Sequence, residues 1–304
     1  AVTEGDKVEA QIKLGWSING YGVGDLVEYI NAVTTEQVEA LMAEYGRLYS
    51  IDPKADKKQI EYQARLEIAI RKFLEDGGFG AFTNTFQDLY HMEQLPGLAT
   101  QRMMEAGYGY GGEGDWKTAA LVRIMKIMSG NKRTSFMEDY TYNLEKGNET
   151  ILGAHMLEVC PTIAANKPAI EVHPLGIGGK SDPARLVFDG EVGDAVCASL
   201  IDIGGRIRLI VNEVKSVKIK NKMPNLPVAR VLWSPKPNLK TAAEAWILAG
   251  GAHHTCMSFD VTSEQLRDWA EIMGIECVVI GDNTDIASFK NELRFNNLAY
   301  RLNL

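Results

Sequence analysis

Cysteine is scarce in this sequence, and no two cysteines stand close together. The four in 304 residues form no C-x-x-C pair; they are Cys160, Cys197, Cys256 and Cys277. This spacing argues against a zinc ribbon, and the chain length argues against a disulfide framework. We therefore expect four reduced cysteines that belong to the core of a cytoplasmic protein.

Long apolar runs and basic clusters are also missing. No stretch approaches the roughly 18 consecutive apolar residues of a transmembrane helix, and AVTEGDKVEA lacks the basic and then apolar pattern of a signal peptide. The 32 basic residues are outnumbered by 40 acidic ones, for a formal net charge of -8. The sequence therefore predicts a cytoplasmic protein that binds neither nucleic acid nor a membrane, and it favours a small neutral or metal-bound ligand.

Helix and strand signals alternate over residues 1–134. Thr3 is placed to cap a helix that ends at Gly15, and Thr34 with Gln37 forms a capping box for another. Further patterns predict helices and one strand, namely helices over 56–76, 96–106 and 115–128 and a strand over 79–86. We interpret this alternation as an α/β domain of the doubly wound type, with a mostly parallel sheet.

Residues 135–304 have a different pattern. Strand-like segments follow one another with glycine-rich turns between them, at 135–144, 150–157, 184–188, 195–203, 206–217 and 228–233. Helical patterns are confined to 241–249, 263–273 and the region near Phe289. This part is predicted to be a second, β-rich domain that resembles a barrel and carries appended helices.

Two glycine-rich motifs resemble nucleotide-binding sequences but lack the right context. GYGYGG at 107–112 matches G-x-G-x-x-G, yet it follows a predicted helix rather than a strand. GIGGKS at 176–181 ends like a phosphate loop, but Pro174 occupies the position of the first glycine. We interpret both motifs as glycine-rich loops.

A predicted hairpin brings a glutamate and a histidine together. The strands 135–144 and 150–157 flank a turn at Lys146-Gly147, and this turn places Glu138 directly opposite His155. Directly opposed residues of an antiparallel pair share a face, with their Cβ atoms about 5 Å apart. The pair predicts either a metal site or a buried ion pair, and these residues alone do not separate the two.

Two further motifs place functional side chains next to glycine. In GGAHHT, residues 250–255, a strand is predicted from His254, so only one of His253 and His254 can face a given site. Glu113 lies among glycines just ahead of a helix that Asp115 is placed to cap. Packing of the histidines and helix capping by the acid are the alternatives to a role in binding.

Several segments together closely resemble the L-arabinose isomerase family, and the likeness covers essentially the whole chain; they are YGYGGEGDWKTAALVRIMKIM, SFMEDYTYNLEKGNETILGAHMLEVCP, HPLGIGGKSDPARLVF and EAWILAGGAHHT. The resemblance implies one divalent metal ion, typically Mn²⁺, with Co²⁺ or Mg²⁺ as alternatives. The implied ligands are Glu113, Glu138, His155 and His254. It also implies substrate contact at His254 and at Phe86, for which an ordinary core position is the alternative, and it leaves His253 to orientation or packing.

The resemblance further implies an activity and an assembly. Family members interconvert L-arabinose and L-ribulose, and many also convert D-galactose to D-tagatose. Proton transfer through an enediol would use Glu113 and Glu138 as base and acid, in a homo-oligomer, either a trimer or a hexamer. Family members begin with another domain that this sequence lacks, so the alternative is a metal- and sugar-binding core with little or no turnover.

Overall fold

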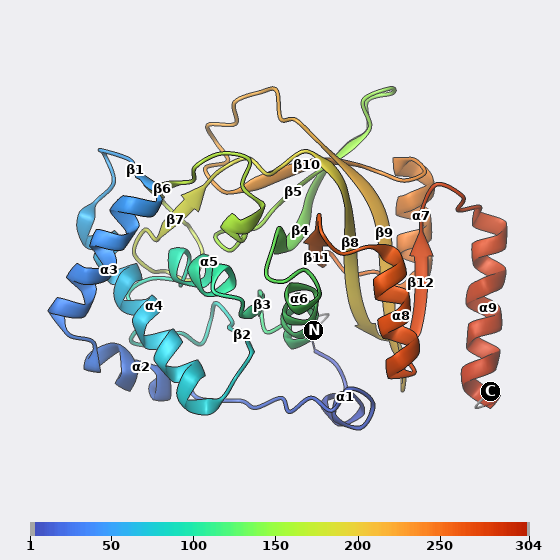
Figure 1. The fold of residues 1–304 in the computed structure, drawn as a ribbon, viewed down its shortest axis with the longest axis horizontal. Helices are drawn as coiled ribbons and strands as arrows, with labels where there is room; N and C mark the ends of the chain where they lie inside the picture. Colours follow the sequence, from blue (N-terminus) through green and yellow to red (C-terminus); the bar gives the residue numbers. More distant parts are fainter. Residues whose placement is uncertain (1–3, 303–304) are drawn as a thin grey trace.

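The first part of the chain is mainly helical (Figure 1). The computed structural model describes residues 4–302, and its helices here are α1 (Lys7–Leu14), α2 (Val23–Ala32), α3 (Thr35–Leu48), α4 (Lys57–Gly77), α5 (Leu98–Glu105) and α6 (Trp116–Met128). The capping box of Thr34 and Gln37 is confirmed at the start of α3. Asp6 caps α1, while Thr3, the predicted cap, lies outside the described residues.

The strands of this first part are short. They are β1 (Ser50–Ile51), β2 (Ala81–Thr83) and β3 (Gly109–Gly111). β2 and β3 form a parallel pair, and β1 pairs in parallel with β6 (Ala169–Val172), which continues antiparallel into β7 (Ala184–Val187). The fold is mixed α/β, and the predicted doubly wound sheet is not confirmed, because only three residues of the predicted strand 79–86 join a sheet.

The second part contains a closed antiparallel barrel. Its strands are β4 (Thr134–Asn143), β5 (Thr150–Ala154), β8 (Gly193–Asp202), β9 (Ile207–Val217), β10 (Arg230–Pro235) and β11 (His254–Ser258). They follow the order β10-β5-β4-β11-β8-β9, and pairing of β9 with β10 closes the ring. The prediction of a barrel is therefore confirmed.

Helices and one more strand surround the barrel (Figure 1). They are the 3₁₀ helix η1 (Pro161–Ile163), the helices α7 (Leu239–Ala249), α8 (Ser263–Met273) and α9 (Ile286–Leu302), and the strand β12 (Glu276–Ile280). The sequence analysis did not identify β12, which extends the sheet by pairing in parallel with β9. Apolar side chains of β12 pack on α8 on one face and near α7 and α9 on the other.

The β4–β5 hairpin keeps the predicted register only near its turn. Thr141 pairs with Leu152 as expected, but a bulge between Asp139 and Thr141 adds one residue to β4. Glu138 consequently pairs with Ala154 instead of His155. On the other side of β4, Glu138 lies directly opposite His254 of β11. The prediction of a direct Glu138–His155 pair was therefore wrong, and the histidine that lies opposite Glu138 is the second one of GGAHHT.

All four cysteines are free, three of them buried and Cys277 partly so, as predicted for reduced core residues.

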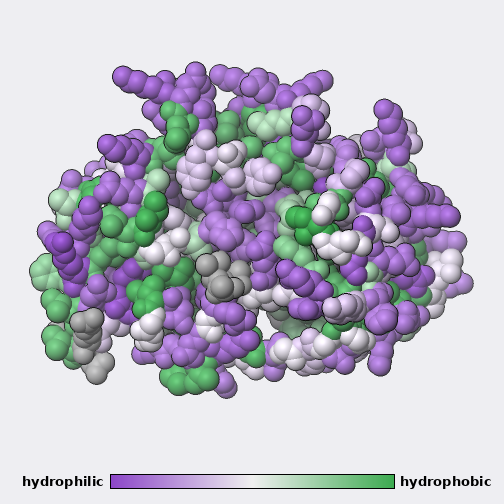
Figure 2. Space-filling view, turned by 180° about the vertical axis from the view of Figure 1, so that it is seen from behind, coloured by the Kyte–Doolittle hydropathy of each residue, from purple (hydrophilic) through white to green (hydrophobic). Residues whose placement is uncertain are grey.

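No helix within residues 4–302 combines the length and the apolar character that crossing a membrane requires. The face seen in Figure 2 is largely hydrophilic, with hydrophobic side chains in separate patches.

Candidate metal centre

Three of the four predicted ligands meet beside the start of α6. One ligand atom each from Glu113, His155 and His254 lies within 4.8 Å of the others. The two histidines are 2% and 1% exposed, and their ring centroids are 5.6 Å apart. A carboxylate and two imidazoles without a thiolate suit a divalent first-row metal ion.

Glu138, the fourth predicted ligand, lies next to this group but is not part of it. Its place opposite His254 puts the two Cβ atoms about 5 Å apart on one face of the sheet. Phe136 lies two residues earlier on the same face of β4. Its ring packs edge-on against those of His155 and His254, with centroid distances of 4.7 and 5.1 Å. The half-buried Glu138 side chain therefore belongs to the side of β4 that faces the two imidazoles.

A buried carboxylate holds each imidazole through its Nδ1 atom. Nδ1 of His155 lies 2.5 Å from Oε2 of Glu158, and Nδ1 of His254 lies 3.1 Å from Oδ2 of Asp115. This arrangement fixes the ring orientation and leaves Nε2 to bind a metal ion. Nε2 of His254 is buried and has no hydrogen-bond partner among the described residues, which is costly unless a ligand binds it. The residues therefore fit a metal ion.

The sequence analysis missed these two supporting carboxylates. Asp115 was expected only as a helix cap, and it does cap α6, because its Oδ1 accepts the backbone N–H of Thr118. Burial alone raises the pKa of Asp115, but hydrogen bonds from His254 and Thr118 outweigh it and hold the pKa below its ordinary value. Glu158 was not identified, although its position three residues after His155 was an available signal.

The loop that carries Glu113 has an unusual backbone. Glu113 and Gly114 have φ values of 61° and 82°, and the left-handed region is rare for residues other than glycine and often found at functional sites. The Gly114 N–H donates to the carbonyl of Asn84 at 3.1 Å, and the Tyr110 hydroxyl donates to Oδ1 of Asn84, also at 3.1 Å. These bonds hold the carboxylate of Glu113 beside the histidines.

The glycines of the 107–112 motif allow close packing. A Cβ atom at Gly109 would lie 2.1 Å from the carbonyl oxygen of Ala119, and one at Gly111 would lie 2.3 Å from that of Asp115. Both contacts are to the backbone at the start of α6, so glycine is required for β3 to reach this helix. Half of the motif therefore belongs to the buried strand β3, so the prediction of a glycine-rich loop was wrong for residues 109–111.

Gly112 lies directly against the imidazole of His155. A Cβ atom there would be 2.9 Å from Cε1 and 3.0 Å from Nε2. We expect Gly112→Ala to displace the ring, to destabilise the fold by about 1–3 kcal/mol and to weaken metal binding. Thermal unfolding and metal titration measure both effects. Gly20→Ala is the control, since its Cβ atom would meet nothing within 4 Å. If both variants unfold at the same temperature and bind the metal equally well, the predicted clash between residue 112 and His155 does not occur.

The pKa of His155 is raised from its ordinary value of 6.5. Burial alone lowers it, but the charge of Glu158 and its hydrogen bond, followed by the charges of Glu138 and Glu113, outweigh burial. A raised pKa stabilises the folded, metal-free chain fully below the unfolded value of about 6.5, and this contribution is lost as the pH rises through the folded-state pKa.

Replacing Glu158 should change this pH dependence. We expect Glu158→Gln to reduce the unfolding free energy of the metal-free chain more at about pH 5.5 than at about pH 8.5, on either side of the ordinary histidine pKa. Denaturant unfolding at a series of pH values measures the difference. A loss that is the same at every pH would mean that the carboxylate does not control the protonation of His155.

Phe86 and His253 are the remaining predicted residues. Phe86 follows β2 in a loop, partly buried against the larger core cluster, and the Gly114–Asn84 hydrogen bond places this segment beside Glu113. Its substrate role stays a prediction. His253 lies in a bend before β11, and its ring centroid is 4.4 Å from that of His254. It is not part of the donor group, which consists of Glu113, His155 and His254.

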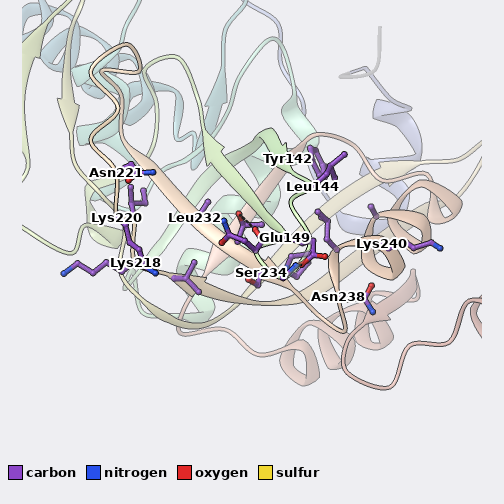
Figure 3. Close-up of a pocket in the computed structure, with 18 of the residues that line it drawn as sticks. Tyr142, Leu144, Glu149, Lys218, Lys220, Asn221, Leu232, Ser234, Asn238 and Lys240 are labelled. Carbon is purple, nitrogen blue, oxygen red and sulfur yellow. Dashed lines mark hydrogen bonds between the residues drawn. The ribbon is translucent and has the colours of Figure 1, made fainter.

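A large open groove lies elsewhere on the molecule (Figure 3). Its volume is about 1010 Å³, and it runs between the β4–β5 hairpin, the end of β9, β10 and the start of α7. Tyr142 and Leu144 lie on one side, with Lys218 and Lys220 across from them (Figure 3). None of the four predicted metal ligands lines this groove.

The fold and the donor group define a class, namely a mixed α/β protein in which a histidine–carboxylate site lies between an antiparallel barrel and a helix. Comparison with known proteins then gives the family. Residues 1–131 match the model of the L-arabinose isomerase central domain, and residues 133–276 match that of the L-arabinose isomerase C-terminal domain. The chain belongs to the L-arabinose isomerase family.

Individual relatives agree with this assignment. The chain is 65% identical over 306 residues to the L-arabinose isomerase of Geobacillus stearothermophilus, covering 99% of this chain and 62% of the relative. The chain is 66% identical over 303 residues to the Anoxybacillus flavithermus enzyme, and the match covers 98% of this chain and 61% of that enzyme. The chain is 61% identical over 307 residues to the Bacillus subtilis enzyme, and the match covers 99% of this chain and 62% of that enzyme. The chain thus spans about three fifths of the length of the curated relatives that it matches.

Proposed function

We propose that this chain is a metal-dependent aldose–ketose isomerase that interconverts L-arabinose and L-ribulose. The observation that carries the proposal is the buried Nε2 of His254, which lies beside His155 and Glu113 and has no hydrogen-bond partner within residues 4–302. The names of the relatives support L-arabinose as the substrate. D-galactose, with D-tagatose as its product, is proposed as a second substrate pair.

Glu113, His155 and His254 would hold one divalent ion, with Mn²⁺ the first choice and Co²⁺ or Mg²⁺ as alternatives, and Glu138 would complete the set. When bound, the ion polarises the substrate's oxygens and stabilises the negative charge that develops on them. Glu158 and Asp115 orient the two imidazoles through Nδ1.

The two glutamates would move the proton. In the proposed reaction Glu113 and Glu138 act as base and acid, and the proton passes between adjacent carbons of the open-chain sugar through an enediol. Phe86 would contribute an apolar wall of the pocket, and His253 would support His254. We also propose a cytoplasmic homo-oligomer, either a trimer or a hexamer.

The direct test is an assay of L-ribulose formation from L-arabinose by the metal-stripped chain, with and without added Mn²⁺. Product that appears only with the ion supports the isomerase. The second candidate is a metal- and sugar-binding core with little turnover, since the donor group alone accounts for metal binding. Full occupancy by Mn²⁺ without product would support that candidate and overturn the first.

A further inference from the structure

Lys126 and Cys160 meet in the interior of the protein, outside the donor group. Nζ of Lys126 lies 3.4 Å from Sγ of Cys160. The two residues are only 1% and 0% exposed. Lys126 belongs to the last turn of α6, and Cys160 immediately precedes η1. An amine and a thiol are thus held in contact by two separate elements.

Lys126 has no carboxylate partner within ion-pair distance among the described residues. Among residues 4–302, its other side-chain contact is to Oδ1 of Asn131 at 3.2 Å. The hydroxyl of Thr162 lies 3.2 Å from Sγ of Cys160. Buried lysines are normally paired with a carboxylate, because an isolated buried charge is costly. Lys126 instead directs its amine to the sulfur of Cys160 and the amide oxygen of Asn131.

The two residues that contact the pair lie closer to the surface than the pair itself. Asn131 and Thr162, which contact the amine and the sulfur, are both only partly buried. Burial raises the pKa of the Cys197 and Cys256 thiols well above the ordinary value, and these two buried cysteines serve as the comparison for Cys160.

We propose that hydrogen peroxide converts Cys160 and Lys126 into a covalent sulfur–nitrogen cross-link. In the first step Sγ attacks peroxide: an S–O bond forms, the O–O bond breaks, sulfur loses two electrons, and one water leaves. In the second step the neutral Nζ attacks the sulfenic sulfur: the S–N bond forms, the S–O bond breaks, and the hydroxyl leaves as water with a proton from nitrogen. The protein loses two hydrogens in total, and peroxide is reduced to two waters.

The link would join two elements that support the donor group. Asp115, which holds His254, caps the start of α6, and Glu158, which holds His155, lies two residues before Cys160. The linked residues are 34 positions apart, so closing this loop restricts the unfolded chain and raises the Tm. A thiol reductant would cleave the sulfur–nitrogen bond and return the Tm to its original value.

Peptide mapping by mass spectrometry tests the proposal on the full chain. After peroxide treatment without reductant, we expect a cross-linked peptide that contains Lys126 and Cys160 and is two hydrogens lighter than the sum of its parts. Dithiothreitol should abolish this peptide. The Tm should rise after peroxide treatment and return to its starting value after dithiothreitol.

Two variants provide matched comparisons. Lys126→Arg keeps the charge and a donor but removes the primary amine, so the cross-link should be lost, whereas Cys256→Ser should retain it. The wild-type mapping decides the matter even where a variant does not fold. Cys160 that stays unmodified, or that stops at the sulfenic or a higher acid without the link, would overturn the proposal.

Discussion

Glu138→Gln should lower the rate of L-ribulose formation by about 100-fold or more, the range typical for losing a general acid or base. The side chain lies opposite His254 and on the face of β4 that carries Phe136, which packs on both imidazoles. Glutamine keeps the shape and one oxygen ligand but cannot carry the proton. We therefore expect turnover to fall far more than the affinity for Mn²⁺, measured by initial rates at saturating sugar and by metal titration.

Glu149→Gln is the control for this experiment. It is the same substitution on the same hairpin, but Glu149 is exposed and its carboxylate accepts the backbone N–H of Gly147. Turnover should not change in this variant. Unchanged turnover in Glu138→Gln as well would exclude Glu138 from proton transfer and leave Glu113 as the candidate.

His254→Gln should weaken Mn²⁺ binding much more than His253→Gln. The loss should exceed the roughly 10- to 100-fold that follows removal of an outer partner of a metal ligand. His254 is 1% exposed, and its free Nε2 belongs to the donor group, while His253 is partly exposed and outside that group. Calorimetric titration of the metal-stripped chains measures the two affinities.

Thermal unfolding checks the same prediction independently. Mn²⁺ at about 100 times its dissociation constant should stabilise the wild-type chain by roughly 2.7 kcal/mol. The increase in Tm should be retained in His253→Gln and largely lost in His254→Gln. The reverse order would show that the other histidine of the pair binds the ion.

The amino-acid sequence by itself determined the features that depend on near neighbours. The capping box of Thr34 and Gln37 and the start of β11 at His254 appear as predicted, and α4 (Lys57–Gly77) lies within one residue of the predicted helix 56–76 at each end. Helix caps and strand alternation depend on residues within a few positions of each other, so such patterns are readable from the chain. The resemblance to a family supplied the set of candidate ligands, three of which the structure brings together.

Only the tertiary structure decided the features that depend on distant contacts. The bulge in β4 moves Glu138 away from His155 and leaves it opposite His254, because β11 pairs with β4 from the other side. The second role of Asp115 likewise requires segments that are far apart in the chain, because His254 lies 139 residues away, whereas Glu158 is only three residues from His155. The doubly wound sheet is not confirmed, and β1 pairs with β6 from the second part of the chain. Strand partners and bulges are selected by packing between distant segments, and local patterns carry little information about them.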